Sequence, residues 1–281
     1  MFVSQYGTDG FGHQLFGMMS LIACIDISYV SFPHNGKFEH LSKEESVMCK
    51  FFINNFLNNI FGDFENISNK KKIIMPRRKN NLCLKSFQFE KDIIYVFDNC
   101  WSTDNIGYYI KNFAFDKYIT NSLNNLLTTN TNFDTNKCNV VVHIRGGDGK
   151  DRISGSLKND YLILLNNIIK KMSFQHKNII FHIHSNSPIN NMFISENIIS
   201  KYNSDIIQSF SEMIFADVLI AGDSSLSLVA PYFNKNKLVI VPNKTTCFTG
   251  NDRNAHPLLY YNNCITFNNF INGNININDY L

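Results

Sequence analysis

The hydrophobic positions of this chain recur with two different periods, which divide it into alternating strands and helices. Short runs of β-branched residues, such as NVVVHI at 139–144 and KLVIVP at 237–242, have the length and composition of buried strands. Longer segments, such as 45–61 and 157–173, place apolar residues three and four positions apart, which is the spacing of one helix face. We therefore expect strands at 2–6, 27–32, 92–99, 139–144, 178–185, 217–222 and 237–242, and helices at 12–25, 45–61, 104–130, 157–173, 195–202, 210–216 and 224–233.

This alternation predicts an α/β fold in which parallel sheets are covered by helices on both faces. The polar stretch TTNTNFDTNK at 128–137 interrupts the pattern and is the best candidate for a linker. A boundary near residue 135 gives an N-terminal lobe at 1–135 and a C-terminal lobe at 136–281. In the C-terminal lobe, which has the pattern of a doubly wound sheet, a ligand is expected at the carboxyl ends of the strands.

Composition narrows the class of protein. Hydrophobic residues make up 44% of the 281 positions and charged residues only 17%, which argues against a disordered or coiled-coil protein. The net charge is +3, and the basic run KKKIIMPRRK at 70–79 is interpreted as a solvated loop rather than a nucleic-acid surface. The seven cysteines form no CxxC pair, so they favour a reduced compartment and offer no zinc site. The first apolar segment, FGMMSLIACIDISYV at 16–30, contains Asp26 and is too short to span a bilayer, so we expect no signal peptide and no membrane anchor.

The segment VVVHIRGGD at 140–148 ends a strand in three polar, titratable side chains around two glycines. A strand that leads into a glycine turn brings the backbone close to a bound phosphate. Arg145 supplies the planar, charged fork that phosphate oxygens require, and His143, two residues earlier, points to the same face of the strand. Asp148 could orient Arg145 or cap the turn. The alternative is an ordinary tight turn with an incidental surface arginine.

The segment ADVLIAGDSSLSLVAPYF at 216–233 repeats this arrangement on a second strand. The strand ends in Gly222 and Asp223, and Ser224 and Ser225 open the next helix, where hydroxyl and N–H groups can bind an anion. Simple capping of the helix is the alternative. Two such turns on neighbouring strands of one sheet would suit a diphosphate.

Two further motifs indicate a function less specifically. The segment YGTDGFGHQLFGMM at 6–19 is a glycine-rich turn that enters a helix, but Leu15 breaks the dinucleotide fingerprint. The sequence HIH at 182–184 puts two histidines on one strand face; without a third ligand, a buried pair bonded to other side chains is favoured over a metal site.

Together these motifs resemble the α1,2- and α1,6-fucosyltransferase superfamily. HIRGGD at 143–148 is similar to its HxRxGD signature, and GFGHQLFGMMS at 10–20 is similar to the GLGNQLFQYA opening of the α1,2-fucosyltransferases. The segment 211–244 follows the family's third block, and HIHSNSPIN at 182–190 takes the place of a strand that ends in a polar loop. The motifs occur in the family's order and cover most of the chain.

The resemblance implies a GT-B-like fold, with two Rossmann-like lobes whose parallel sheets face a central cleft and a C-terminal lobe that binds the nucleotide sugar. It implies inverting transfer of fucose from GDP-fucose to a glycan hydroxyl, of the α1,2 type, with no cofactor and no metal. In the family's pattern Arg145 holds the diphosphate and promotes departure of GDP, while His143 and Asp148 shape this catalytic site. The other implied donor-site residues are Asp217 at the guanine edge, Ser224 and Ser225 at the phosphates, and Gly10, Gly12, His13 and Gln14 along the cleft.

Departures from the family pattern leave alternatives open. Gly146 stands where the family has a second basic residue, His13 replaces an asparagine, and Leu228 and Val229 replace tryptophans. The same scaffold could use another nucleotide-linked deoxysugar, or could bind a nucleotide sugar or glycan without turnover.

The general base is also open, among Asp9, Asp148 and His13. The partners that we expect are a GDP-sugar and a glycan acceptor, with no nucleic acid and no membrane span. The expected location is the cytoplasm of a bacterial cell or of a virus-infected host cell, with peripheral attachment to a membrane left open.

Overall fold

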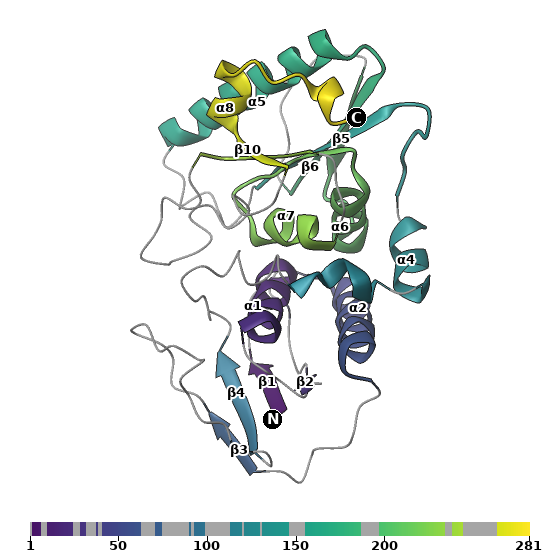
Figure 1. Cartoon of the computed structure of the whole chain (residues 1–281), viewed down its shortest axis with the longest axis vertical. Coiled ribbons are helices and arrows are strands. Elements are labelled where there is room, and N and C mark those ends of the chain that lie inside the picture. The colour runs from purple at the N-terminus through teal and green to yellow at the C-terminus, as the bar shows by residue number, and fades with distance from the viewer. Residues whose placement is uncertain are drawn as a thin grey trace. The chain divides into compact units, whose positions relative to one another are not determined.

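A computed structural model divides the chain into two compact units, which are described separately (Figure 1). Unit 1 holds the described residues up to Thr129, and unit 2 holds those from residue 131 onward. Each unit carries its own parallel sheet with helices packed on it, so the predicted α/β class with two Rossmann-like units is confirmed. The structure describes residues 2–6, 10–24, 29–31, 38, 41–62, 71–74, 90, 93–98, 113–119, 121–129, 131–145, 155–186, 197–233, 238–243 and 263–281.

Unit 1 is built on a four-stranded parallel sheet in the order β2-β1-β4-β3. Its helix α2 starts with a capping box, in which Ser42 and Glu45 exchange hydrogen bonds between side chain and backbone. Phe11 of α1 packs edge to face on Phe52 of α2. The elements are β1 (Phe2–Tyr6), α1 (Phe11–Cys24), β2 (Tyr29–Ser31), α2 (Lys43–Phe61), β3 (Lys71–Ile74), β4 (Ile93–Asp98), the 3-10 helix η2 (Phe115–Tyr118) and α4 (Asn121–Thr128).

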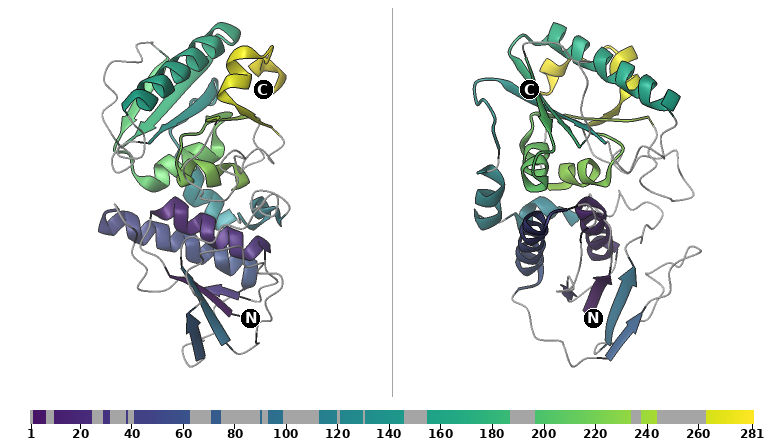
Figure 2. Two further views of the ribbon diagram at one scale, coloured as in Figure 1. Left: turned by 90° about the vertical axis from the view of Figure 1, so that its left-hand side faces the viewer. Right: turned by 180° about the vertical axis from the view of Figure 1, so that it is seen from behind.

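Unit 2 is built on a six-stranded parallel sheet in the order β10-β9-β8-β5-β6-β7. Helices α5 and α8 cover one face of this sheet, and α6 and α7 cover the other (Figures 1 and 2). The elements are β5 (Cys138–Ile144), α5 (Gly155–Gln175), β6 (Ile179–Ser185), β7 (Ile198–Tyr202), α6 (Ile206–Phe215), β8 (Val218–Ile220), α7 (Ser225–Val229), the 3-10 helix η4 (Ala230–Phe233), β9 (Leu238–Val241), β10 (Cys264–Thr266), α8 (Phe267–Asn272) and the 3-10 helix η6 (Ile277–Asp279).

The two faces of β5 have different neighbours. Val140 and Val142 point into an apolar core formed with α5 and α8, where Leu165 and Met172 are fully buried. Because side chains alternate along a strand, His143 belongs to the opposite face, toward α6 and α7. The sheet therefore has one mainly apolar face and one face that carries buried histidines, and the second face is the one that concerns function.

The structure corrects three predictions of secondary structure. The segment 195–202 was expected to be helical, but Ile198–Tyr202 forms β7 and pairs with β6 at the edge of the sheet. Within the basic run at 70–79, Lys71–Ile74 forms β3 rather than a loop. The strand at 238–241 is followed by another, β10, so it is not the last. In each case pairing with a distant strand decides the conformation, and local propensity does not.

Among the helices that the structure describes, none has the length and apolar character needed to cross a bilayer.

Candidate functional site

The strand order of unit 2 places a topological switch point between β5 and β8. Counted in chain order, its six strands lie as 3-2-1-4-5-6, so the winding reverses at the pair β5–β8. These strands pair in parallel, with Val142 opposite Ile220. The last residues of β5 and Arg145 after them, and the residues Ala221 to Ser225 that follow β8, therefore lie at the same end of the sheet. Open α/β sheets bind ligands at this edge, outside the carboxyl ends of the strands at the switch point.

Gly222 brings the two strand ends into close contact. A Cβ atom at this position would lie 2.5 Å from the carbonyl oxygen of His143 and 3.4 Å from its Nδ1 atom. Since a real Cβ does not come within 3.0 Å of such an atom, only glycine fits here without a shift of the backbone. A hydrogen bond also stabilises the turn after β8, because the hydroxyl of Ser227 donates to the carbonyl oxygen of Gly222 at 3.1 Å.

Ser224 and Ser225 follow this turn and are partly exposed, as the prediction of a ligand site requires. Ser224 is the N-cap residue of α7, but its hydroxyl makes no capping hydrogen bond. The alternative that the Ser224 side chain simply caps the helix is therefore wrong.

His143 is held in the uncharged form. Burial, followed by the positive charges of His184 and Arg145, lowers its pKa to about 3. Among the described residues, its buried Nδ1 atom has no hydrogen-bond partner. At neutral pH this histidine therefore offers hydrogen-bonding atoms, while Arg145, partly buried at the end of β5, provides the positive charge.

Tyr161 of α5 also belongs to this end of the sheet, and no motif in the sequence indicates it. Its hydroxyl lies 3.4 Å from the carbonyl oxygen of His143. Burial, with a further effect of the Asp223 carboxylate, raises the pKa of Tyr161 above its ordinary value. The phenol therefore stays protonated, and Asp223 is its electrostatic neighbour.

The two histidines of the HIH motif are bonded to side chains, as was favoured over a metal site. Nε2 of His184 lies 2.7 Å from Oε2 of Glu212, and Nε2 of His182 lies 3.1 Å from Oδ1 of Asn139. In the part of the chain that the structure describes, no group of three or more His, Cys, Asp or Glu side chains is arranged to hold a metal ion.

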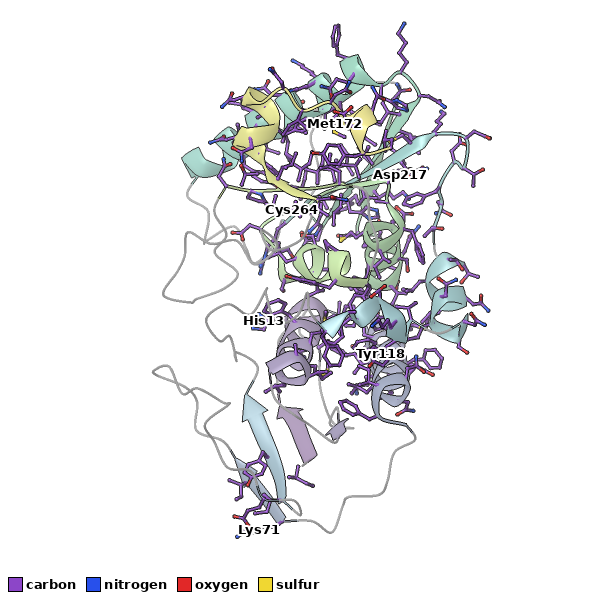
Figure 3. All side chains as sticks on the ribbon, in the orientation of Figure 1. His13, Lys71, Tyr118, Met172, Asp217 and Cys264 are labelled. Carbon is purple, nitrogen blue, oxygen red and sulfur yellow. The ribbon has the colours of Figure 1, made fainter. Side chains whose placement is uncertain are left out.

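Asp217 lies at the opposite end of the strands, where β5 and β8 begin. It precedes β8, and its carboxylate accepts a hydrogen bond from the backbone N–H of Asn139 at 2.9 Å, where β5 begins (Figure 3). The five steps along the chain from Asp217 to Gly222 span about 16 Å at the rise of an extended chain. The structure therefore brings His143, Arg145, Ser224 and Ser225 to one edge, and it does not bring Asp217 to them.

The remaining predicted residues lie elsewhere or outside the described part. Gly10, Gly12, His13 and Gln14 belong to unit 1, at the start of α1, where the carbonyl oxygen of Gly10 accepts from the N–H groups of His13 and Gln14 at 3.1 Å (Figure 3). Asp9, Gly146 and Asp148 lie outside the described residues.

Comparisons with known proteins find similarity at the level of fold. No protein-family model matches the sequence, and no curated protein sequence matches it significantly. Similar solved structures include POFUT1 in complex with GDP (TM-score 0.43, 11% identity, 84% of this chain and 94% of that chain). They also include POFUT1 in complex with GDP-fucose (TM-score 0.44, 11% identity, 84% and 95%). A Listeria monocytogenes structure, described as that of a UDP-N-acetylglucosamine 2-epimerase, has a TM-score of 0.40 at 8% identity, over 88% of this chain and 80% of that chain.

Proposed function

We propose that the chain is an inverting glycosyltransferase that transfers fucose from GDP-fucose to a hydroxyl group of a glycan, with α1,2 linkage. One observation carries this proposal: Arg145 leaves β5 at the switch point of unit 2, beside the turn at Gly222. This is where open α/β sheets bind nucleotides, and a guanidinium fork matches phosphate oxygens. The order of the segments 10–20, 143–148 and 211–244 supports the choice of fucose, because it resembles that of the fucosyltransferases.

In this reaction the bond between the anomeric carbon and the β-phosphate oxygen breaks, and its electron pair leaves with GDP. The acceptor oxygen bonds to the opposite face of the anomeric carbon, so the configuration inverts, and its proton passes to a general base, for which the sequence offers Asp9, Asp148 and His13. Arg145 stabilises the negative charge that develops on the leaving diphosphate, which lowers the barrier. His143, whose pKa is lowered to about 3, contributes hydrogen bonds rather than charge.

Ser224 and Ser225 lie at the same edge and are proposed to bind the phosphates. Asp217 is not included in the proposed donor site, because its carboxylate is bonded to the backbone of Asn139 at the other edge. The roles of Asp148 and of the four residues at the start of α1 rest on the sequence resemblance.

The test is calorimetric titration of the full chain with GDP, UDP and CDP, without added metal, for the wild type and for Arg145→Ala. We expect GDP to bind selectively and the variant to lose at least about tenfold in affinity, because the charged fork is gone. In transfer assays with GDP-fucose, Arg145→Ala should lose about 100- to 1000-fold in rate. Arg145→Lys should recover part of the binding, since it keeps the charge but not the fork.

Lys170→Ala is the matched control, because it removes an exposed positive charge from α5 in the same unit. It should bind GDP like the wild type. Preference for UDP or CDP would overturn the assignment of fucose, and unchanged GDP binding in Arg145→Ala would refute the role of the arginine. Nucleotide binding without transfer to any glycan acceptor would leave a nucleotide-sugar-binding protein.

A further inference from the structure

A cluster of buried polar side chains lies between the sheet of unit 2 and α6, next to the candidate site. Its centre is Glu212, which is fully buried. One carboxylate oxygen of Glu212 lies 2.7 Å from Nε2 of His184, and the other accepts a hydrogen bond from Nζ of Lys201. Nδ1 of His184 lies 3.1 Å from the hydroxyl of Ser209 on α6. Both ring nitrogens of His184 are therefore occupied by α6, which fixes the ring in one orientation.

The second histidine of this strand, His182, connects the cluster to the amino edge of the sheet. The amide nitrogen of Asn139 donates to the carbonyl oxygens of Asp134 and Lys137, at 2.8 Å and 2.9 Å. Its amide oxygen is thus left to accept from Nε2–H of His182 at 3.1 Å. His182 therefore faces Asn139, and only His184 extends the cluster toward the carboxyl edge, among the described residues.

Stability alone does not explain this cluster. Burial acts to raise the pKa of Glu212, but hydrogen bonds from His184 and Lys201 outweigh it and lower the pKa to about 2, so the carboxylate is charged. Replacing a buried ion pair by well-packed apolar residues is often neutral or stabilising. What the buried pair does provide is geometry, because it fixes the orientation of the groups that are bonded to it.

The neighbour in question is His143. His184 and His143 occupy the same level of the parallel ladder between β5 and β6, so their side chains lie side by side on one face. His143 in turn contacts the turn at Gly222 and precedes Arg145 by two residues. The ring of His184, which is held at both nitrogens, is therefore a fixed neighbour of the His143 side chain.

We propose that Glu212 is a positioning residue for the donor site, which acts by holding His184 against His143. This inference rests on the function proposed above, because it assigns Glu212 to the nucleotide site of unit 2. Glu212 itself does not touch the nucleotide. Loss of its acceptor oxygen should let the ring of His184 turn, which frees His143 and misaligns the end of β5 that carries Arg145.

The test compares GDP affinity in three folded variants. Lys201→Met is the reference, because it removes the partner charge and leaves the hydrogen bond between His184 and Glu212. The other two variants carry a second substitution in addition to Lys201→Met. Glu212→Gln keeps a neutral acceptor for His184 in nearly the same place, and Glu212→Leu removes it. We expect the variant with leucine to bind GDP about tenfold more weakly than the reference, and the variant with glutamine to recover most of that loss.

The ring nitrogen resonances of His143 and His184 give a second measurement that does not depend on those variants. GDP should shift the resonances of His143 in the wild type. Ser209→Ala, which removes the other anchor of His184, should alter the resonances of both histidines and weaken GDP binding severalfold. If Ser209→Ala changes His184 but leaves His143 and the GDP affinity as in the wild type, the positioning role is refuted.

The outcomes separate this inference from the proposed function. If the wild type binds none of the three nucleotides, the proposed function is refuted, and so is this inference, which depends on it. If the wild type binds GDP and Arg145→Ala binds it much more weakly, the nucleotide site of the proposed function stands. Equal affinities of the reference and of the variant with leucine would then overturn the positioning role alone.

Discussion

Substituting Gly222 by alanine tests the geometry of the candidate site most directly. The added Cβ would lie 2.5 Å from the carbonyl oxygen of His143, so the end of β5 or the turn after β8 must move by at least about 0.5 Å to reach even the shortest separation that real Cβ atoms show. Overpacking of this kind costs about 1–3 kcal/mol of unfolding free energy. Because the two segments that move carry Arg145 on one side and Ser224 and Ser225 on the other, GDP affinity should fall about tenfold or more.

Gly273 provides a control with the same steric conflict at another place in unit 2. A Cβ on Gly273, at the C-terminus of α8, would lie 2.4 Å from the carbonyl oxygen of Asn269. Urea unfolding should give similar losses of stability for Gly222→Ala and Gly273→Ala, whereas calorimetry should show weaker GDP binding only for Gly222→Ala. If both variants bind GDP with wild-type affinity, the turn at Gly222 does not form part of the nucleotide site.

Two further predictions concern stability. Burial keeps the pKa of His143 at about 3 and that of His182 at about 4, both below the ordinary 6.5, so the unfolded chain binds protons that the folded chain does not. The unfolding free energy should therefore fall as the pH drops below 6.5, by up to about 1.4 kcal/mol per pH unit for each histidine; a flat profile in urea unfolding between pH 6.5 and 5 would contradict this. Lys171 donates to the carbonyl oxygens of Phe270 and Gly273 at 2.6 Å and 2.7 Å, so Lys171→Met should cost about 1–3 kcal/mol in the same assay. The matched change at the exposed Lys170 should cost little, and equal effects of the two would contradict the assigned bonds.

Much of the local structure follows from the order of apolar and polar residues. The strands at 139–144 and 178–185 and the helices at 45–61 and 157–173 occur close to the predicted positions. Their periodicity is strong and covers enough residues to identify each element without its neighbours. The sequence also shows where these strands end, because glycine and polar residues follow them. This is why Arg145 and Ser224 are predicted to lie in a ligand site.

What the sequence could not predict depends on partners far away along the chain. The strand Ile198–Tyr202 forms because β6 offers it a free edge, and its own residues were equally compatible with a helix. Asp217 belongs to the same sequence block as Ser224, but an extended strand separates the two across the sheet.

The sequence by itself determined the alternation of strands and helices, the doubly wound character of the C-terminal half and the presence of Arg145 at the end of a strand, because these depend on residues close together in the chain. Only the tertiary structure decided that β5 pairs with β8, that Gly222 lies against the carbonyl oxygen of His143, and that Glu212 is buried against His184. These features depend on the distance between groups that are far apart in sequence. Packing sets that distance, and no local pattern records it.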